Sequence, residues 1–337
     1  MRFGIAFANT GPLAEGPIAA GVARAVEAAG FESVWTVEHV LVPVDYQSTY
    51  PYAKSGRMPG GESFDIPDPL VWLAYVAAAT TTLRLGTGIL ILPQRNPAIV
   101  AKEVASLDRL SGGRVELGIG VGWLEEEFDA LGVPFAGRGA RTDAYVAAMR
   151  ALWTGEEVDL DDGYHRWQRA VSLPRPAAAH VPIVVGGHSE AAARRAGRLG
   201  DGFFPGKGSP AELAHLFGVV RAAAEEAGRD PDAIELTAGH PGVLGDDPLG
   251  AVEELAALGV TRTIVPPMAW DVAGAEEATE PSPRRSSTGS DPPARTPSAR
   301  PGITAPAAAS RRGWPRPSRP GRTPCRAWAS SGGCRPR

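Results

Sequence analysis

Segments typical of strands and helices alternate along most of the chain. Short apolar runs bounded by glycine or proline are followed by stretches in which apolar residues recur every three or four positions. Capping signals mark several helix starts, among them Asn96-Pro97 and the sequence Ser-Pro-Ala-Glu at 209–212. The strands that we expect cover residues 2–8, 33–39, 85–92, 114–122, 181–187, 201–205, 234–240 and 261–267.

Eight strands that are mostly apolar on both faces and separated by helices predict a parallel sheet covered on both sides. Their number and the length of the region suit a (β/α)8 TIM barrel, which typically takes about 250 residues. A doubly wound open sheet is the alternative fold. That alternative is less favoured because no Gly-x-Gly-x-x-Gly follows the first expected strand.

The composition changes sharply at residue 279. From Thr279 to Arg337 the sequence has twelve arginines, twelve prolines, no lysine and two acidic residues. Such a segment cannot bury enough apolar surface to offset its chain entropy, so we predict a disordered tail. We therefore divide the chain into a barrel domain, 1–278, and an Arg/Pro-rich tail, 279–337. The tail is interpreted as a frame-shifted or run-on C-terminus in preference to a basic arm for anionic partners.

The net charge, the apolar runs and the cysteines of the chain limit its partners and its location. The net charge is −4, which gives no indication of a nucleic-acid partner. No apolar run approaches the roughly 20 residues that cross a bilayer, and the N-terminus lacks a signal peptide's apolar region. Cys325 and Cys334 both lie in the tail, so thiol chemistry in the barrel is excluded. We expect a cytoplasmic protein without a membrane partner, and leave a homodimer open.

The expected strand ends narrow the chemistry, because a TIM barrel carries its active site at the carboxyl ends of its strands. Glu38 is the one carboxylate at such an end, which disfavours a glycosidase with paired carboxylates. Glu38, His39, His188 and His240 include no closely spaced ligand pair across strands, so no metal site is predicted, and a metal-dependent hydrolase stays a remote alternative. No Gly-x-Ser-x-Gly motif indicates a covalent nucleophile.

Glycines are frequent at the same strand ends and could admit a flat or phosphorylated ligand close to the backbone. Gly86 and Gly88 interrupt an otherwise apolar strand, where glycine often marks a bulge or a close approach. The sequence Gly-Gly-His-Ser-Glu at 186–190 precedes a helix, so the N–H groups of Gly187, His188 and Ser189 could bind an anion. An ordinary strand-to-helix turn would have the same sequence.

Together, several blocks of this sequence resemble the luciferase-like monooxygenase superfamily. The blocks are WTVEH, the long stretch from Leu85 to Phe128, VPIVVGG and GDGFFP. Within that superfamily they are most similar to the oxidoreductases that use the deazaflavin coenzyme F420. The resemblance covers roughly residues 1–275 and implies a (β/α)8 barrel with a flavin or deazaflavin across its strand ends.

The resemblance also implies roles for particular residues. Gly88-Ile89 matches a bulge with a non-proline cis peptide whose side chain supports the back of the cofactor ring. Glu38 and His39 match an acid–histidine pair beside the ring, and His39 is the expected proton donor or acceptor. Val121 and Gly122 match positions that face the cofactor's tail. The phosphate pocket is matched by Gly186, Gly187 and His188, with Ser189 at the following helix start.

The substrate is expected to lie over the ring. The loop from Leu41 to Pro69, with three tyrosines and Arg57, is the predicted lid, and we call it the lid loop. Some relatives with sugar substrates carry a glutamate where this chain has Trp123, so a sugar substrate is not implied.

The function that we predict is hydride transfer between coenzyme F420 and an unknown small organic substrate. FMN with molecular oxygen, as in a flavin monooxygenase, is the alternative, and a flavin-binding barrel without turnover is the second alternative. Because F420 carries several negative charges, cations should surround its tail. The residues that we expect there are Lys207, Arg95, Arg194 and Arg195.

Overall fold

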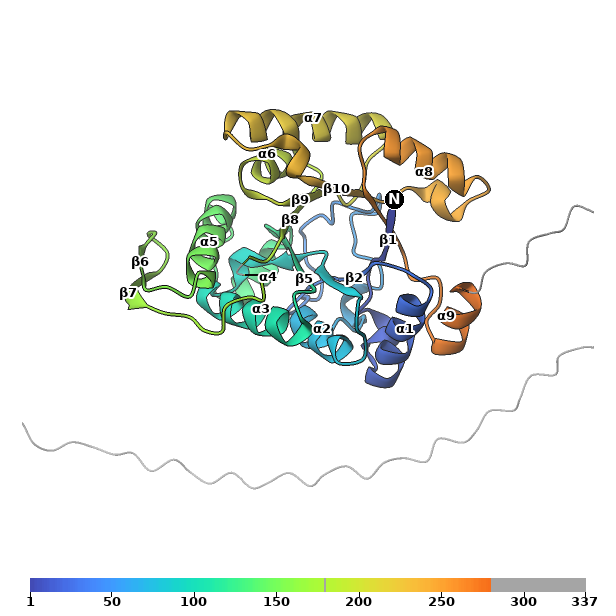
Figure 1. The fold of residues 1–337 in the computed structure, drawn as a ribbon, viewed down its shortest axis with the longest axis horizontal. Helices are drawn as coiled ribbons and strands as arrows, with labels where there is room; N and C mark the ends of the chain where they lie inside the picture. Colours follow the sequence, from blue (N-terminus) through green and yellow to red (C-terminus); the bar gives the residue numbers. More distant parts are fainter. Residues whose placement is uncertain (179, 280–337) are drawn as a thin grey trace, which may run out of the picture. The chain divides into compact units, whose positions relative to one another are not determined.

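The computed structural model describes residues 1–178 and 180–279, so the predicted tail from residue 280 onward lies outside the described residues. Nine strands pair in the order β3-β2-β1-β11-β10-β9-β8-β5-β4, and β3 also pairs with β5. This last pairing closes the sheet. Because β4 continues the course of β3, the result is a closed barrel of eight parallel strand positions, as the sequence predicts (Figure 1). The strands are β1 (Arg2–Ile5), β2 (Ser33–Thr36), β3 (Arg84–Thr87), β4 (Leu90–Ile91), β5 (Val115–Gly120), β8 (Ile183–Gly186), β9 (Gly202–Phe204), β10 (Glu235–Ala238) and β11 (Arg262–Val265).

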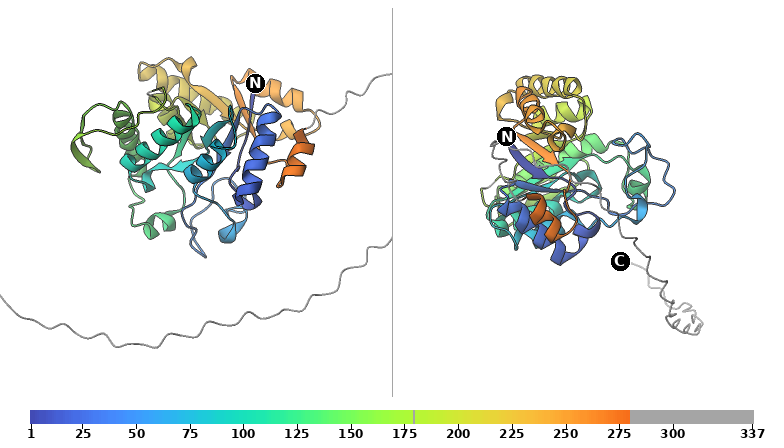
Figure 2. Two further views of the ribbon diagram at one scale, coloured as in Figure 1. Left: turned by 60° about the horizontal axis from the view of Figure 1, so that its bottom comes forward. Right: turned by 90° about the vertical axis from the view of Figure 1, so that its right-hand side faces the viewer.

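Helices surround this barrel on its outside, as the views in Figures 1 and 2 agree. They are α1 (Gly16–Ala28), α2 (Pro69–Ala77), α3 (Pro97–Ser111), α4 (Glu125–Ala130), α5 (Arg138–Trp153), α6 (Glu190–Leu199), α7 (Pro210–Glu226), α8 (Pro248–Ala257) and α9 (Val272–Thr279). Within the described ranges, no helix is long and apolar enough to cross a bilayer.

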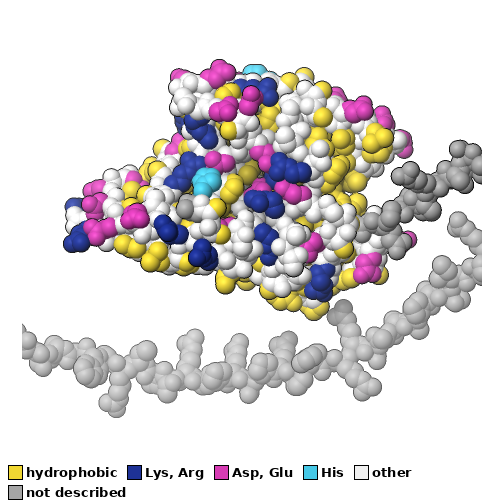
Figure 3. All heavy atoms as spheres, viewed as in Figure 1, with side chains coloured by type: hydrophobic (Ala, Val, Ile, Leu, Met, Phe, Trp, Pro, Cys, Tyr) yellow, Lys and Arg dark blue, Asp and Glu magenta, His cyan; other side chains and the backbone are white. Residues whose placement is uncertain are grey.

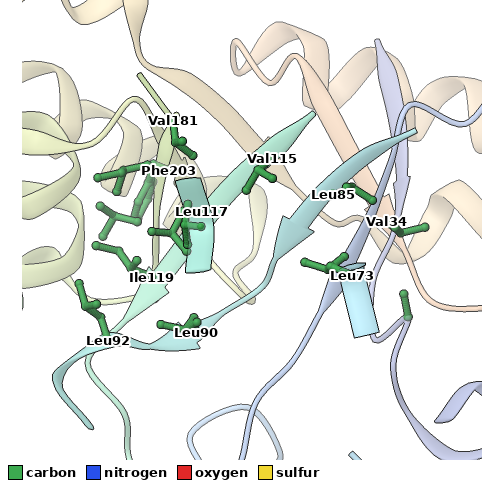
Figure 4. Packing of buried hydrophobic residues seen from close by; sticks show 14 of the residues in the cluster. Val34, Leu73, Leu85, Leu90, Leu92, Val115, Leu117, Ile119, Val181 and Phe203 are labelled. Carbon is green, nitrogen blue, oxygen red and sulfur yellow. The ribbon is translucent and has the colours of Figure 1, made fainter. Parts of the chain in front are cut away.

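Alternate residues of each strand face the helices and form the main apolar core. On β5 these are Val115, Leu117 and Ile119, each at most 1% exposed. Figure 4 shows them among buried side chains from other strands, including Leu90 and Phe203. This packing results from the period-two alternation of a strand whose outer face is covered by helices.

The inward-facing residues at the amino ends of the strands form a charged cluster. Its centre is Arg262 of β11, which is fully buried. Its guanidinium donates to Glu32 at 2.8 Å and to Glu116 at 2.9 Å, and its Nη1 lies 2.5 Å from Glu235. Arg2 and Arg84 pair with the same carboxylates from the outside, through the contacts Arg2–Glu32 and Arg84–Glu116. Figure 3 shows that basic and acidic side chains lie next to one another across the middle of one face of the molecule.

Trp35 of β2 fills the next level of the barrel interior and is 1% exposed. Its indole packs with Val184, Ile264 and Phe204, and the Arg262 guanidinium lies 5.2 Å from its ring centre. A side chain on Gly86 would reach within 2.5 Å of the indole. Gly86 of β3 therefore makes room for Trp35. Of the two glycines that interrupt the predicted third strand, only Gly88 lies at the bulge.

A hairpin outside the barrel was not predicted. Strands β6 (Val158–Asp161) and β7 (Arg166–Ala170) form an antiparallel hairpin outside the barrel sheet. β6 alternates apolar and polar residues over only four positions, and β7 carries three polar residues among its five, so neither gives a strong strand signal.

We expect that Arg262→Met destabilises the protein by about 3 kcal/mol or more, because it leaves buried carboxylates without their cation. In the native protein burial raises the pKa of Glu32, but Arg262 more than compensates and the pKa lies below its ordinary value of 4.5. The stabilisation is therefore present above about pH 4.5 and is lost as the pH falls further. The variant's deficit should be largest near pH 7 and should shrink toward pH 4, where its carboxylates become protonated.

Chemical denaturation at several pH values measures this deficit. Arg2→Met is the matched control, because Arg2 belongs to the same cluster but its side chain is 42% exposed. An equal effect of both substitutions, or a deficit that does not depend on pH, would contradict the prediction.

Candidate active site

The bulge predicted in the third strand is present at the carboxyl ends of the barrel strands. Strand β3 stops at Thr87, the peptide Gly88-Ile89 is cis, and β4 resumes at Leu90. The Ile89 side chain lies over the last residues of the next two strands. A Cβ placed on Gly120 would lie 2.5 Å from Ile89 Cδ1, and one placed on Gly186 would overlap Ile89 Cγ2. Ile89, Gly120 and Gly186 thus form one surface from three strands, which we call the Ile89 shelf.

Glu38 supports this shelf from below. Its carboxylate is 5% exposed, accepts the N–H of Ile91, and forms a two-point ion pair with Arg95, of which the Nε contact is 2.7 Å. Arg95 also binds Asp68 at 2.6 Å. Burial raises the pKa of Glu38, although the neighbouring Arg95 charge acts in the opposite direction. The structure thus places Glu38 as a support for the segment that follows Ile89.

His39 has a partner that was not identified from the sequence. Its Nδ1 lies 3.0 Å from Oε2 of Glu127, which is fully buried in α4. The other oxygen of Glu127 accepts the backbone N–H groups of Val40 and Leu41 at 2.7 and 3.3 Å. No hydrogen bond within the described residues uses His39 Nε2, so this nitrogen is available to a ligand.

The neighbouring Glu126 holds the lid loop. Its carboxylate accepts the N–H groups of Gln47 and Ser48 at 2.6 and 3.1 Å and the Ser48 hydroxyl at 2.7 Å. The Ser48 hydroxyl and these N–H groups lower the pKa of Glu126 to about 2. Consecutive residues of α4 therefore fix the loop and the histidine.

An unbroken row of aromatic rings crosses the mouth from His39 to His188. The rings of His39 and Trp123 pack edge to face with their centres 5.6 Å apart, and those of Trp123 and Tyr50 do so at 5.2 Å. Tyr50 contacts Tyr52 at 5.5 Å, and Tyr52 lies 4.9 Å from the ring of His188. The lid loop thus lies against both the strand that carries His39 and the segment predicted to bind phosphate.

The predicted anion site at the start of α6 is partly formed. The Ser189 side chain caps the helix by accepting the N–H of Ala192 at 3.2 Å. The N–H of Gly187 donates to Phe204 at 3.2 Å, so it does not point at a ligand, and the N–H groups of His188 and Ser189 remain for one. The Nδ1 atom of His188 is buried without a partner in the described part of the chain. Burial lowers the pKa of His188, and the charge of Lys207 adds to this effect.

The four cations expected around a cofactor tail all have partners in the protein. Arg95 binds Glu38 and Asp68, and Lys207 donates to the carbonyl of Pro51. Arg194 pairs with Glu190, and Arg195 pairs with Asp143.

Arg138, at the start of α5, was not among these expected cations. Its Nε donates to the carbonyl of Gly122 at 3.2 Å, and its guanidinium lies 3.7 Å from the ring centre of Phe135. Its hydrogen bonds in the described residues go only to carbonyl oxygens. Gly122 and the half-buried Val121 were predicted beside the cofactor tail, and Gly122 has a φ of 78° with Phe128 packed against its Cα. Arg138 is thus a cation that lies beside Gly122.

His39 and the Ile89 shelf lie at the carboxyl ends of the strands of a parallel barrel. Enzymes with a (β/α)8 barrel carry their active sites at this end. Residues 1–305 match the family described as luciferase-like monooxygenase, and the chain belongs to this family. An uncharacterized protein of Mycobacterium tuberculosis is 36% identical over 245 residues, which cover 72% of this chain and 83% of the relative. The F420-dependent glucose-6-phosphate dehydrogenase of Nocardia farcinica is 38% identical over 186 residues, or 53% of this chain and 54% of the relative.

Solved structures share the fold at lower identity. The coenzyme F420-dependent tetrahydromethanopterin reductase of Methanopyrus kandleri superposes with a TM-score of 0.66 at 19% identity, over 83% of this chain and 97% of that one. The oxygenating constituent of 3,6-diketocamphane monooxygenase from Pseudomonas putida, in complex with FMN, gives a TM-score of 0.56 at 20% identity over 70% and 66%. Both structures thus share the barrel fold of this chain.

We expect that Gly186→Ala destabilises the protein by about 1–3 kcal/mol, because its new methyl group overlaps Ile89. Adding Ile89→Ala to this variant should restore most of the loss, since it removes the overlapping atoms. Thermal unfolding of the two single variants and the double variant gives the coupling.

Gly218→Ala in α7 is the control, because nothing lies within 4 Å of a Cβ placed there. This change should be neutral or slightly stabilising, as expected for alanine inside a helix. Additive effects of the Gly186 and Ile89 substitutions would show that the Ile89 shelf does not exist as described.

Proposed function

We propose that this protein is an oxidoreductase that transfers hydride between coenzyme F420 and a small organic substrate. The observation that carries the proposal is His39, held at Nδ1 by Glu127 with Nε2 left for a ligand, at the strand ends that also form the Ile89 shelf. The F420-dependent glucose-6-phosphate dehydrogenase among its relatives supports the choice of cofactor class.

The residues present fit a flavin-type cofactor. Ile89 offers an apolar backing for a flat ring, because Gly120 and Gly186 let its side chain lie across two strand ends. At the other end of the mouth, the unpaired Nδ1 of His188 and the capped start of α6 suit the phosphate of a cofactor tail. Arg138 lies beside Gly122 and can supply positive charge to the cofactor tail. The cations first expected there, Arg95, Arg194, Arg195 and Lys207, bind other groups of the protein.

In this proposal coenzyme F420, when bound, accepts or donates a hydride. His39 handles the accompanying proton at Nε2: it accepts the hydroxyl proton when an alcohol is oxidised and returns a proton when a carbonyl is reduced. Glu127 fixes the orientation of the imidazole by binding Nδ1, which leaves Nε2 to face the substrate. Glu38 acts through the backbone at Ile91, so we assign it as a positioning residue.

An FMN-dependent monooxygenase is the second candidate, and the FMN-bound structural neighbour favours it. The same shelf and anion site would accept either ring system. A barrel that binds a flavin-type cofactor without turnover is the third candidate, and it differs from the others in having no need of His39.

We expect the purified protein to bind F420 about tenfold more tightly than FMN, a difference of about 1.4 kcal/mol. Titration of each cofactor at low and high salt measures this, and the affinity for F420 should fall with salt because its tail is anionic. Arg138→Gln should weaken binding and reduce the salt dependence. Arg194→Gln is the matched control, because Arg194 is paired with Glu190 on the same helix. Tighter binding of FMN would assign the protein to the flavin monooxygenases.

We expect His39→Ala to lower turnover by about 10²–10⁴-fold while leaving the affinity for the cofactor nearly unchanged. Turnover of F420 with a panel of alcohols and carbonyl compounds measures the first quantity, and the cofactor titration measures the second. Glu127→Gln should cause a smaller loss, since an amide can still bind Nδ1 but carries no charge. Full activity of His39→Ala would contradict the role of His39.

A further inference from the structure

We propose that the substrate is a neutral compound built on an apolar ring system with one hydroxyl or carbonyl group, and that Trp123 determines this specificity. The inference rests on the proposed function, since it assigns the substrate class of the same site. It is carried by the aromatic wall, which we define as Trp123, Tyr46 and Tyr50. The indole of Trp123 lies 5.4 Å from Tyr46 and 5.2 Å from Tyr50.

The aromatic wall contacts the ring of His39, whose Nε2 is the proposed contact with the substrate. The His39 ring meets Trp123 at 5.6 Å and an interplanar angle of 81°, so the edge of the imidazole and the indole share one side of the mouth. A substrate oxygen that reaches His39 Nε2 brings the rest of the molecule against Trp123. An apolar ring is the group that gains most from this contact, because aromatic faces attract ring edges and bury large apolar areas.

The aromatic wall is held in place before any ligand arrives. Tyr46 is 4% exposed, and its hydroxyl accepts the N–H of Met58 at 2.9 Å. The Arg57 guanidinium lies 4.6 Å from the Tyr46 ring centre. Ser48, between the two tyrosines, is bound by Glu126 of the helix that follows Trp123. A fixed wall loses little side-chain freedom on binding, which favours a rigid ligand of matching shape.

The charged groups around the aromatic wall all bind protein groups, although Arg57 and Lys207 bind neutral carbonyls and not carboxylates. Glu127 binds His39 and two backbone N–H groups, and Glu126 binds the lid loop. Arg57 donates to the carbonyl of Tyr46, Lys207 donates to that of Pro51, and Arg95 is neutralised by two carboxylates.

A phosphate placed at the aromatic wall would lose its water and would have to compete with a backbone carbonyl for Arg57 or Lys207, whereas a neutral ring has neither cost. The relative from Nocardia farcinica, by its name, acts on a phosphorylated sugar. We therefore expect this chain to differ from it in substrate class.

The test uses three probes of defined chemistry and isothermal titration calorimetry. The neutral two-ring hydroxyl compound 2-naphthol should bind the wild-type protein. Its phosphate ester, 2-naphthyl phosphate, should bind more weakly, and glucose 6-phosphate should not bind measurably. Trp123→Leu should weaken the binding of 2-naphthol about tenfold, whereas Trp123→Phe should restore most of it because phenylalanine keeps an aromatic face.

Tyr75→Ala is the control, since Tyr75 lies on α2 and is 50% exposed. Its 2-naphthol affinity should equal that of the wild type. Tyr50→Leu, in the same aromatic wall, provides the measurement if Trp123→Leu does not fold. Equal affinity of the Leu variant and the wild type for 2-naphthol would overturn the inference, and so would tighter binding of glucose 6-phosphate than of 2-naphthol.

All titrations are run with and without F420. If F420 does not bind while 2-naphthol binds in a Trp123-dependent way, the proposed function is wrong and the substrate class stands. If F420 binds and the affinity for 2-naphthol does not depend on Trp123, only the substrate class is wrong.

Discussion

The charge on Arg262 is the constraint on which the interior of the barrel depends. One fully buried guanidinium neutralises Glu32, Glu116 and Glu235 at the amino ends of the strands. Because a buried carboxylate without a cation is costly, this end of the barrel keeps the strands in register. The positions that point inward are then fixed along every strand, since side chains alternate between the two faces. Trp35 fills the next level, and Ile89 ends the series at the mouth.

Several glycines of the strands make room for large side chains that fill the barrel interior. Gly86 gives its space to the indole of Trp35, whereas Gly120 and Gly186 give theirs to Ile89. A small residue on one strand is thus the counterpart of a large one on another. The apolar surface offered to a flat ring consists of a side chain supported by neighbouring strands, and its position follows from the packing below it.

The sequence predicted the eight barrel strands and the closed parallel sheet, because apolar runs bounded by glycine or proline and capping residues are local signals. It also led, through the family resemblance, to the cis peptide at Gly88-Ile89 and to His39 at the end of the second strand. It did not predict the partner of His39. Glu127 is the third of three adjacent glutamates, and only the turn of α4 makes one of them fully buried while Glu125 stays exposed. Nor could it tell that Arg95, Arg195 and Lys207 have partners, since those partners lie far along the chain, whereas Glu190 lies four residues before Arg194 on the same helix.

The mouth of the barrel therefore has two parts with different supports. The Ile89 shelf is carried by β4, β5 and β8, and its shape follows from the packing of the barrel interior. The side that carries His39 and Trp123 is carried by α4, because Glu127 binds the histidine and Glu126 binds the lid loop. The two parts are joined at one end of the lid loop, where Asp68 binds Arg95 and Arg95 binds Glu38. In the proposed function, this arrangement gives a physical reason why one barrel can keep a cofactor class while its substrate changes, since the shelf and the side that carries Trp123 are supported mainly by different elements.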